Sequence, residues 1–251
     1  MPDTSQTKAD WFAILDYGTF EVAEDARRIP IQGYVVVSGE HVVLVDTGFP
    51  DAYYDDAEAA GRADGLDEFG RLVSIGPENR PHAQLALLGL TPADVTELVL
   101  THGDVDHVGG MHDFAAATIV MSQRERDAGP PRYHGDVRPL DWPTNARYRL
   151  VAGDQELAPG VLALATPGHS PGHLSLLVCL GETGDVVLAC DAISREAELS
   201  SGVNGGASDA RAARSSAERL AALAQARDAL LVYGHDPAQS STLRRAPHVY
   251  R

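Results

Sequence analysis

The chain has 251 residues, of which 44% are hydrophobic, so it can bury a large core and is not a disordered protein. Its formal net charge of -16 argues against a partner with a phosphate backbone or an anionic membrane surface, because like charges repel. No apolar run reaches the roughly 18 residues of a membrane-spanning helix and the start lacks the features of a signal peptide, so we expect a cytoplasmic protein without a membrane or nucleic-acid partner.

The first part of the chain predicts strands followed by a less regular segment. "WFAILDYG" (residues 11–18) is typical of a strand, and "GYVVVSGEHVVLVDTG" (residues 33–48) predicts a hairpin that turns at residues 38–40 and ends at Asp46. Residues 50–80 are rich in Ala, Asp, Gly and Tyr, with poor periodicity. We expect them to form irregular or short helical cover over an active site.

The remainder alternates apolar strands with loops before one long helix. Strands are predicted in "TELVL", "TIVMS", "GVLALATPGHSPGHLSLLVCL", "GDVVLACDA" and "ALLVYGHD". The long loop at residues 128–147 is a second candidate cover for an active site. An Ala-, Arg- and Leu-rich helix is predicted at residues 208–228. Cys179 and Cys190 lie in apolar runs, so we expect two reduced thiols in the core.

Polar side chains gather at the ends of these strands, and they are types that bind metals. They are Asp46, His102, Asp104, Asp106, His107, His169, Asp191 and His235. In "HGDVDH" alternate residues of an extended segment point the same way, so one face carries several candidate ligands. Imidazoles mixed with carboxylates are typical of two ions that share a bridging oxygen. The sequence therefore predicts a dinuclear metal site.

The motifs "HGDVDH", "TPGHSPGH", "ACDA" and "YGHD", preceded by "VDTG", resemble the metallo-β-lactamase superfamily in order and spacing. The layout across nearly the whole chain is most similar to the bacterial N-acyl homoserine lactone lactonases. This resemblance implies an α+β fold, a four-layer αββα sandwich with the metal site at one edge of the two sheets. It also implies that residues 1–251 form one metallo-β-lactamase domain.

The resemblance implies roles for the candidate residues. Seven side chains would hold two divalent ions: His102, Asp104 and His169 for the first, Asp106, His107 and His235 for the second, and Asp191 for both. Asp106 and Asp191 are the expected catalytic residues, because a hydroxide bridging the metals would attack the carbonyl and Asp106 would pass a proton to the leaving oxygen. Asp46 would brace the metal loop, and His173 would order the "PGH" loop.

Position 104 departs from the family pattern, which usually has His there. An Asp104 carboxylate has a similar reach, so it can keep a ligand in place, but it adds a negative charge. Zn is the metal that the family implies, and the added charge makes Mn or Fe possible because these ions prefer harder ligands. The alternative for Asp104 is a solvated carboxylate outside the ligand set, beside a weaker first site.

Position 194 is the second departure, because the lactonases usually carry Tyr where this chain has Ser194. That Tyr is implied to stabilise the developing oxyanion, and losing one such donor costs about 3 kcal/mol. Another group must therefore substitute, or the substrate differs. Besides Ser194, the candidates for substrate contacts are Tyr133 and His134 in the predicted loop and Phe49, which could equally be a core residue. Tyr53 and Tyr54 also lie in segments that could reach the site.

These observations together predict a metal-dependent hydrolase that opens a lactone ring, N-acyl homoserine lactone above all, and so quenches quorum sensing. One alternative keeps the site but changes the substrate to another ester, lactone, thioester or organophosphate. Another is a metal-bound ligand sensor with little turnover. We expect a small-molecule partner and a chain that acts as a monomer or a homodimer.

Overall fold

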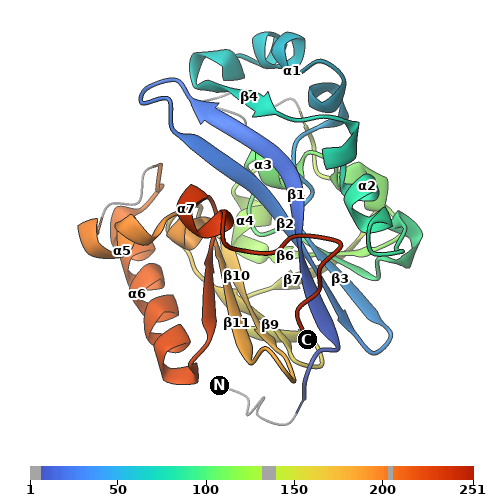
Figure 1. Ribbon diagram of the computed structural model, residues 1–251, viewed down its shortest axis with the longest axis vertical. Helices are drawn as coiled ribbons and strands as arrows, with labels where there is room; N and C mark the ends of the chain where they lie inside the picture. The colour runs from blue at the N-terminus through green and yellow to red at the C-terminus, as the bar shows by residue number, and fades with distance from the viewer. Residues whose placement is uncertain (1–6, 132–139, 203–205) are drawn as a thin grey trace.

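Two β-sheets pack face to face, with helices on their outer sides (Figure 1). The computed structural model describes residues 7–131, 140–202 and 206–251. The seven-stranded sheet has the order β4-β1-β2-β3-β5-β6-β7, and the five-stranded sheet has the order β12-β11-β10-β9-β8. This is the four-layer αββα arrangement that the family resemblance implied.

The seven-stranded sheet joins an antiparallel part to a parallel part. Its strands are β1 (Trp11–Val22), β2 (Arg28–Ser38), β3 (His41–Val45), β4 (Gly70–Ser74), β5 (Glu97–Val99), β6 (Thr118–Ser122) and β7 (Arg147–Val151). β1 pairs antiparallel with β2 and β4, and β2 pairs antiparallel with β3. β3, β5, β6 and β7 are parallel, so the segments that follow β3, β5 and β6 leave the sheet at the same edge.

The five-stranded sheet supplies the other half of that edge. Its strands are β8 (Gln155–Ala158), β9 (Val161–Ala165), β10 (Leu174–Cys179), β11 (Asp185–Cys190) and β12 (Leu230–Tyr233). β11 and β12 are parallel, so Asp191 and His235, which follow them, come to the same end. His169 lies in the connection between β9 and β10.

Short helices connect the strands, and one long helix covers the second sheet. The helices are α1 (Asp51–Asp64), α2 (Pro81–Ala86), α3 (Val105–Val108), α4 (Gln123–Asp127), α5 (Glu196–Ser201), α6 (Ala210–Arg227) and α7 (Pro237–Ser240). α6 agrees with the predicted helix at residues 208–228. The Asp209 carboxylate accepts hydrogen bonds from the backbone N–H groups of Arg211 and Ala212, and Asp228 ends the helix in the left-handed conformation.

The core follows the alternation of side chains along each strand. Phe12 and Ile14 of β1 pack between the two sheets, whereas Ala13 and Leu15 pack on the outer side of the first sheet. On the far side of the second sheet, Leu220 of α6 is fully buried. Burying one such leucine contributes about 1.5–3 kcal/mol. Both cysteines are buried free thiols, as expected from the sequence.

Residues 50–80, predicted as irregular or short helical cover, are more regular than expected. α1 is a helix of 14 residues with a kink at Asp56, and β4 adds an edge strand to the first sheet. Tyr53 and Tyr54 are buried in the same cluster as Phe49. The helix shows poor periodicity because these few aromatic side chains make its core contacts while small and acidic residues cover the rest.

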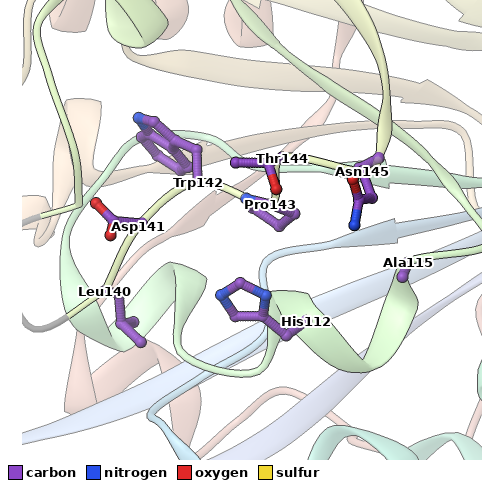
Figure 2. Close-up of a pocket in the computed structure, with 9 residues that line it drawn as sticks. His112, Ala115, Leu140, Asp141, Trp142, Pro143, Thr144 and Asn145 are labelled. Carbon is purple, nitrogen blue, oxygen red and sulfur yellow. The ribbon is translucent and has the colours of Figure 1, made fainter.

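Residues 140–146, the described end of the second predicted cover loop, border a cavity of about 390 Å³ together with His112 and Ala115 (Figure 2). Among the described residues, no candidate metal ligand lines this cavity. It is therefore separate from the predicted site. None of the helices in the described parts of the chain is long and apolar enough to cross a bilayer.

Candidate metal centre

The motif "HGDVDH" begins three residues after β5 ends and leads into α3. His102 and His107 are buried, whereas Asp104 and Asp106 are partly exposed. Asp104 is the residue before the first turn of α3, and its backbone carbonyl accepts from the N–H of His107. The strand end and the short helix therefore turn all four side chains of the motif toward one edge of the sheets.

Two groups of three side chains at this edge could each hold a metal ion. In each group the ligand atoms lie within 4.8 Å of one another. The first group is His102, His169 and Asp191, and the second group is Asp106, His107 and His235. Segments far apart in sequence therefore place six of the seven predicted ligands in two adjacent triads.

Asp191 lies between the two triads and presents one carboxylate oxygen to each. Its Oδ2 is 3.6 Å from Nε2 of His169. Its Oδ1 is 3.4 Å from Nε2 of His107 and 3.1 Å from Nε2 of His235. This is the arrangement needed for one carboxylate to bridge two ions.

Asp104 stands beside the first triad. Its Oδ2 is 3.1 Å from Nε2 of His169 and 3.5 Å from Nε2 of His102. A carboxylate oxygen that faces both imidazole nitrogens is well placed to complete a ligand set with them. Asp104 belongs to neither triad, and 29% of its side chain is exposed.

The electrostatics of the cluster couple the imidazoles to the carboxylates. Burial alone would raise the pKa of Asp191, but His235 and His107 hold it well below its usual range. Burial alone would lower the pKa of His235, but Asp191 and Asp106 raise it to about 9. Protons on these rings thus neutralise the carboxylates, and a divalent cation would take their place on binding.

The second nitrogen of three imidazoles has a partner outside the cluster. Nδ1 of His102 lies 3.1 Å from Thr101 Oγ1. Nδ1 of His107 lies 2.8 Å from Asp46 Oδ2. Nδ1 of His235 lies 2.8 Å from the carbonyl oxygen of Pro30. In each case Nε2 is left for the cluster. Such partners fix ring orientation in metal sites.

The donor set fits divalent metal ions. Nε2 of His102 and of His107 are buried and make no hydrogen bond within the described residues. Buried polar atoms of this kind need a partner, and imidazole with carboxylate suits Zn, Mn and Fe. These atoms are therefore the ones that a bound ion would satisfy.

Asp46 connects the end of β3 to the motif. Its Oδ1 accepts a hydrogen bond of 2.9 Å from the N–H of Thr101, and its Oδ2 lies 2.8 Å from Thr101 Oγ1. The same Oδ2 contacts His107. These contacts are those of a residue that braces the metal loop.

His173 contacts the backbone of the bridging residue as well as its own loop. Its Nε2 accepts from the N–H of Asp191 at 3.1 Å, so Nδ1 carries the proton and lies 2.9 Å from Thr166 Oγ1. Burial, with the nearby charge of His102, lowers the pKa of His173 well below its usual range. His173 is therefore a neutral ring that positions Asp191.

The comparisons with known proteins agree with this geometry. A profile of the metallo-beta-lactamase superfamily matches residues 27–235. The chain belongs to this superfamily. An N-acyl homoserine lactonase of Bacillus thuringiensis is 30% identical over 88% of this chain and 86% of its own length. The N-acyl homoserine lactonase AttM of Rhizobium radiobacter is 32% identical over 66% of this chain and 68% of its own.

Solved structures of N-acyl homoserine lactone hydrolases also superpose on this chain. The structure of an N-acyl homoserine lactone hydrolase with the product N-hexanoyl-L-homoserine at its catalytic metal center superposes with a TM-score of 0.84 and 26% identity, covering 97% of this chain and 100% of that chain. A mutant of AiiA from B. thuringiensis, with N-decanoyl-L-homoserine at its active site, gives a TM-score of 0.83 at 26% identity, covering 97% and 100%. The chain is a metal-dependent hydrolase of this superfamily.

The residues predicted for substrate contacts have different outcomes. Phe49 is a core residue, with ring centroids 5.1 Å from Tyr53 and 6.4 Å from Phe20, which is the second of the two alternatives that the sequence left open for it. An aromatic ring between a strand end and a helix packs better there than in solvent. Tyr133 and His134 lie outside the described residues.

Ser194 lies next to the second triad. Its carbonyl oxygen accepts from the N–H of His235 at 2.9 Å, and its own N–H donates to a carboxylate oxygen of Glu198 at 2.9 Å. Position 194, where the lactonases usually carry Tyr, is therefore adjacent to the metal ligands. Its side chain is a short hydroxyl, which reaches less far than a phenol.

Several hydrogen-bond partners of the site were not predicted from the sequence. Thr101 directly precedes the motif, so its position could have indicated a hydrogen bond to the first ring. Thr166 precedes "PGHSPGH" in the same way. Pro30 contributes only a backbone carbonyl, 205 residues away from His235, and no residue type indicates such a contact.

Proposed function

We propose that this chain is a dinuclear metal-dependent lactonase that opens N-acyl homoserine lactones and so quenches quorum sensing. The observation that carries the proposal is the pair of triads with Asp191 between them. Relatives named N-acyl homoserine lactonase, similar over most of the chain, support the substrate class. The reaction adds one water to a lactone and yields an open hydroxy acid.

The seven predicted ligands would divide between two ions. His102, Asp104 and His169 would hold the first, Asp106, His107 and His235 would hold the second, and Asp191 would contact both. Divalent ions in such a site acidify a bound water and polarise a carbonyl oxygen. The chain fixes the spacing of these ligands through the braces at Nδ1 of His102, His107 and His235.

Asp106 is the residue proposed to handle the proton. It lies in the first turn of α3, its Oδ2 is 3.5 Å from Nε2 of His107, and 20% of its side chain is exposed. Its carboxyl group can therefore reach a substrate from the open side. It would take the proton of the attacking water and give it to the ring oxygen that leaves.

The family implies that the metal is Zn. The Asp104 carboxylate makes Mn or Fe possible as well. Three carboxylates, Asp104, Asp106 and Asp191, belong to the proposed ligand set. The usual His at position 104 would leave only two. An added anionic oxygen ligand favours harder ions relative to Zn, because Zn gains more from imidazole nitrogen.

Hydrolysis of N-hexanoyl and N-decanoyl homoserine lactone by the full chain tests the proposal. The chain is purified without added metal, analysed for metal content, and assayed after loading with Zn, Mn or Fe. We expect ring opening with two ions bound, and a loss in kcat/KM of at least about 100-fold in Asp191→Ala. Asp94→Asn, in an exposed turn before β5, is the control and should keep full activity.

Parallel assays with simple lactones, thioesters, aryl esters and phosphoesters decide the substrate class. Faster turnover of one of these substrates than of either homoserine lactone would replace the proposed substrate but keep the hydrolase. Two bound ions with no turnover of any substrate would instead favour a ligand sensor.

A further inference from the structure

Glu125 is a buried carboxylate beside the metal centre with no role in the ligand set. It is 3% exposed and lies in α4, which follows β6. Ser122 caps this helix, because its Oγ accepts from the N–H of Glu125 at 2.9 Å. The cap and the strand fix where the Glu125 side chain starts.

The two carboxylate oxygens of Glu125 contact two different ligand-bearing segments. Oε1 accepts a hydrogen bond of 2.9 Å from the N–H of Gly103, which lies between His102 and Asp104. Oε2 accepts from Ser170 Oγ at 2.6 Å and from the N–H of Gly172 at 2.9 Å, just after His169. One buried side chain thus joins the motif loop to the loop between β9 and β10.

The segment at Gly172 approaches α4 so closely that it needs glycine, and the segment at Gly103 packs tightly against Glu125. A Cβ on Gly172 would lie 2.0 Å from Ser122 Oγ and 2.2 Å from the backbone nitrogen of Glu125. A Cβ on Gly103 would lie 3.3 Å from Oε1 of Glu125 and 3.5 Å from the ring of Trp142. The backbone of each loop is therefore packed directly against the carboxylate.

His169 depends on this packing more than the other three imidazoles do. Its Nε2 faces Asp104 and Asp191, whereas its Nδ1 is buried and makes no hydrogen bond within the described residues. Among the residues that the structure describes, no partner at Nδ1 orients the ring as Asp46 does for His107. The position of His169 is therefore set by its backbone. Its carbonyl oxygen accepts from the N–H of Ser208 at 3.0 Å, and Glu125 holds the residues that follow it, Ser170 and Gly172.

We infer that Glu125 is a positioning residue that sets the spacing of the first metal site, by holding His102 and Asp104 at a fixed distance from His169. It acts through the backbone of the two loops, and its oxygens are occupied by protein donors. The inference rests on the proposed metal binding but not on the proposed substrate, because ion affinity is measured without substrate.

Glu125→Gln is the sharpest test, since it keeps the shape of the side chain. An amide has one acceptor oxygen, so in either orientation its NH2 group faces the N–H of Gly103 or of Gly172. We expect the affinity for one of two Zn ions, measured by chelator competition, to fall about 10- to 100-fold and the other to change less than about threefold. The visible absorption of the Co-substituted protein should change as well.

Val178→Ala and Ser170→Ala complete the experiment. Val178 is fully buried in β10, so its truncation lowers stability without touching either loop. Ser170→Ala removes one of the three hydrogen bonds that the Glu125 carboxylate accepts from the two loops. It should lower the affinity for the same ion about three- to tenfold. This loss should shrink in the Glu125→Gln background, because both changes break one network.

The inference is overturned if Glu125→Gln binds both ions as the wild type does while its melting temperature falls like that of Val178→Ala. If Glu125→Gln does not fold, unchanged ion affinity in Ser170→Ala overturns it equally. If the wild-type chain binds two ions but opens no homoserine lactone, the proposed substrate is wrong. The role of Glu125 is then still tested by the ion affinities of the variants.

Discussion

The Oδ2 atom of Asp46 lies 2.8 Å from Nδ1 of His107, across 61 residues of sequence. Asp46 follows β3 and His107 lies in α3 beyond β5, and the parallel pairing of these strands brings the two side chains together. With Nδ1 held in this way, Nε2 of His107 is directed at Asp106 and Asp191. A residue that binds no metal therefore sets the direction of one that is proposed to do so.

Asp46→Asn should lower the affinity of the second triad for its ion about 10- to 100-fold. The Asp46 oxygens accept from the N–H of Thr101, from Thr101 Oγ1 and from His107, and an Asn amide leaves at least one backbone or ring N–H facing an NH2 group. Chelator competition with Zn measures the affinity, and kcat/KM should fall in parallel.

Asp94→Asn is the matched control for this change. Asp94 also accepts hydrogen bonds from a backbone N–H and a hydroxyl, both of Thr91, but in an exposed turn. It should leave ion affinity unchanged. Equal ion affinity in Asp46→Asn and the wild type would show that His107 needs no such brace.

Asp104→His should shift the metal preference of the site toward Zn. The substitution replaces an anionic oxygen that faces His169 and His102 with a neutral nitrogen. We expect the ratio of Zn to Mn affinity to rise by roughly tenfold, because imidazole favours Zn more than it favours Mn. Competition between the two metals, followed by metal analysis of the desalted protein, gives this ratio.

Asp104→Asn separates charge from ligand type, because the amide keeps the size of the side chain. Asp104→Asn should lower the affinity of the first triad for both Zn and Mn. An unchanged ratio in Asp104→His together with unchanged affinities in Asp104→Asn would place Asp104 outside the ligand set.

The sequence predicted the elements that carry a strong local pattern. β6 coincides with "TIVMS" because a β-branched apolar run between polar ends fits a buried strand, and α6 coincides within two residues because Asp209 and Asp228 cap a continuous helical segment. The ligand positions followed for a related reason. His and Asp at strand ends are rarely needed for folding, so their clustering indicated chemistry.

Elements whose pattern depends on tertiary contacts were missed. β7 has the sequence "RYRLV" and its side chains are mostly exposed or half-buried, as expected at the edge of a sheet, so it shows little apolar alternation. α1 is held by Tyr53 and Tyr54 rather than by an apolar stripe. Glu125 could not be found either, because a lone Glu in "QRERD" has the composition of a surface helix and its partners come from two distant loops.

His173→Leu should destabilise the metal-free protein by about 1–3 kcal/mol. The substitution leaves the buried N–H of Asp191 without the acceptor that His173 Nε2 provides at 3.1 Å. Urea unfolding in the presence of a chelator measures this loss without the contribution of bound ions. His173→Gln retains an acceptor and should recover part of the stability. Wild-type stability in His173→Leu would contradict the role assigned to the ring.

Gly109→Ala tests how tightly the metal loop packs on the segment after β3. A Cβ at position 109 would lie 2.1 Å from the carbonyl carbon of Phe49 and 2.2 Å from the nitrogen of Pro50, and both are backbone atoms that cannot rotate away. Overpacking of this kind costs about 1–3 kcal/mol, which corresponds to a fall in melting temperature of about 2–12 °C for a chain of this size.

Gly153→Ala is the control, because no atom lies within 4 Å of its added Cβ, and it should melt within about 2 °C of the wild type. Because α3 carries Asp106 and His107, Gly109→Ala should also lower the affinity of the second ion, whereas Gly153→Ala should not. If the two variants melt together and bind metal alike, the close contact between α3 and the backbone at Phe49 and Pro50 does not hold the site.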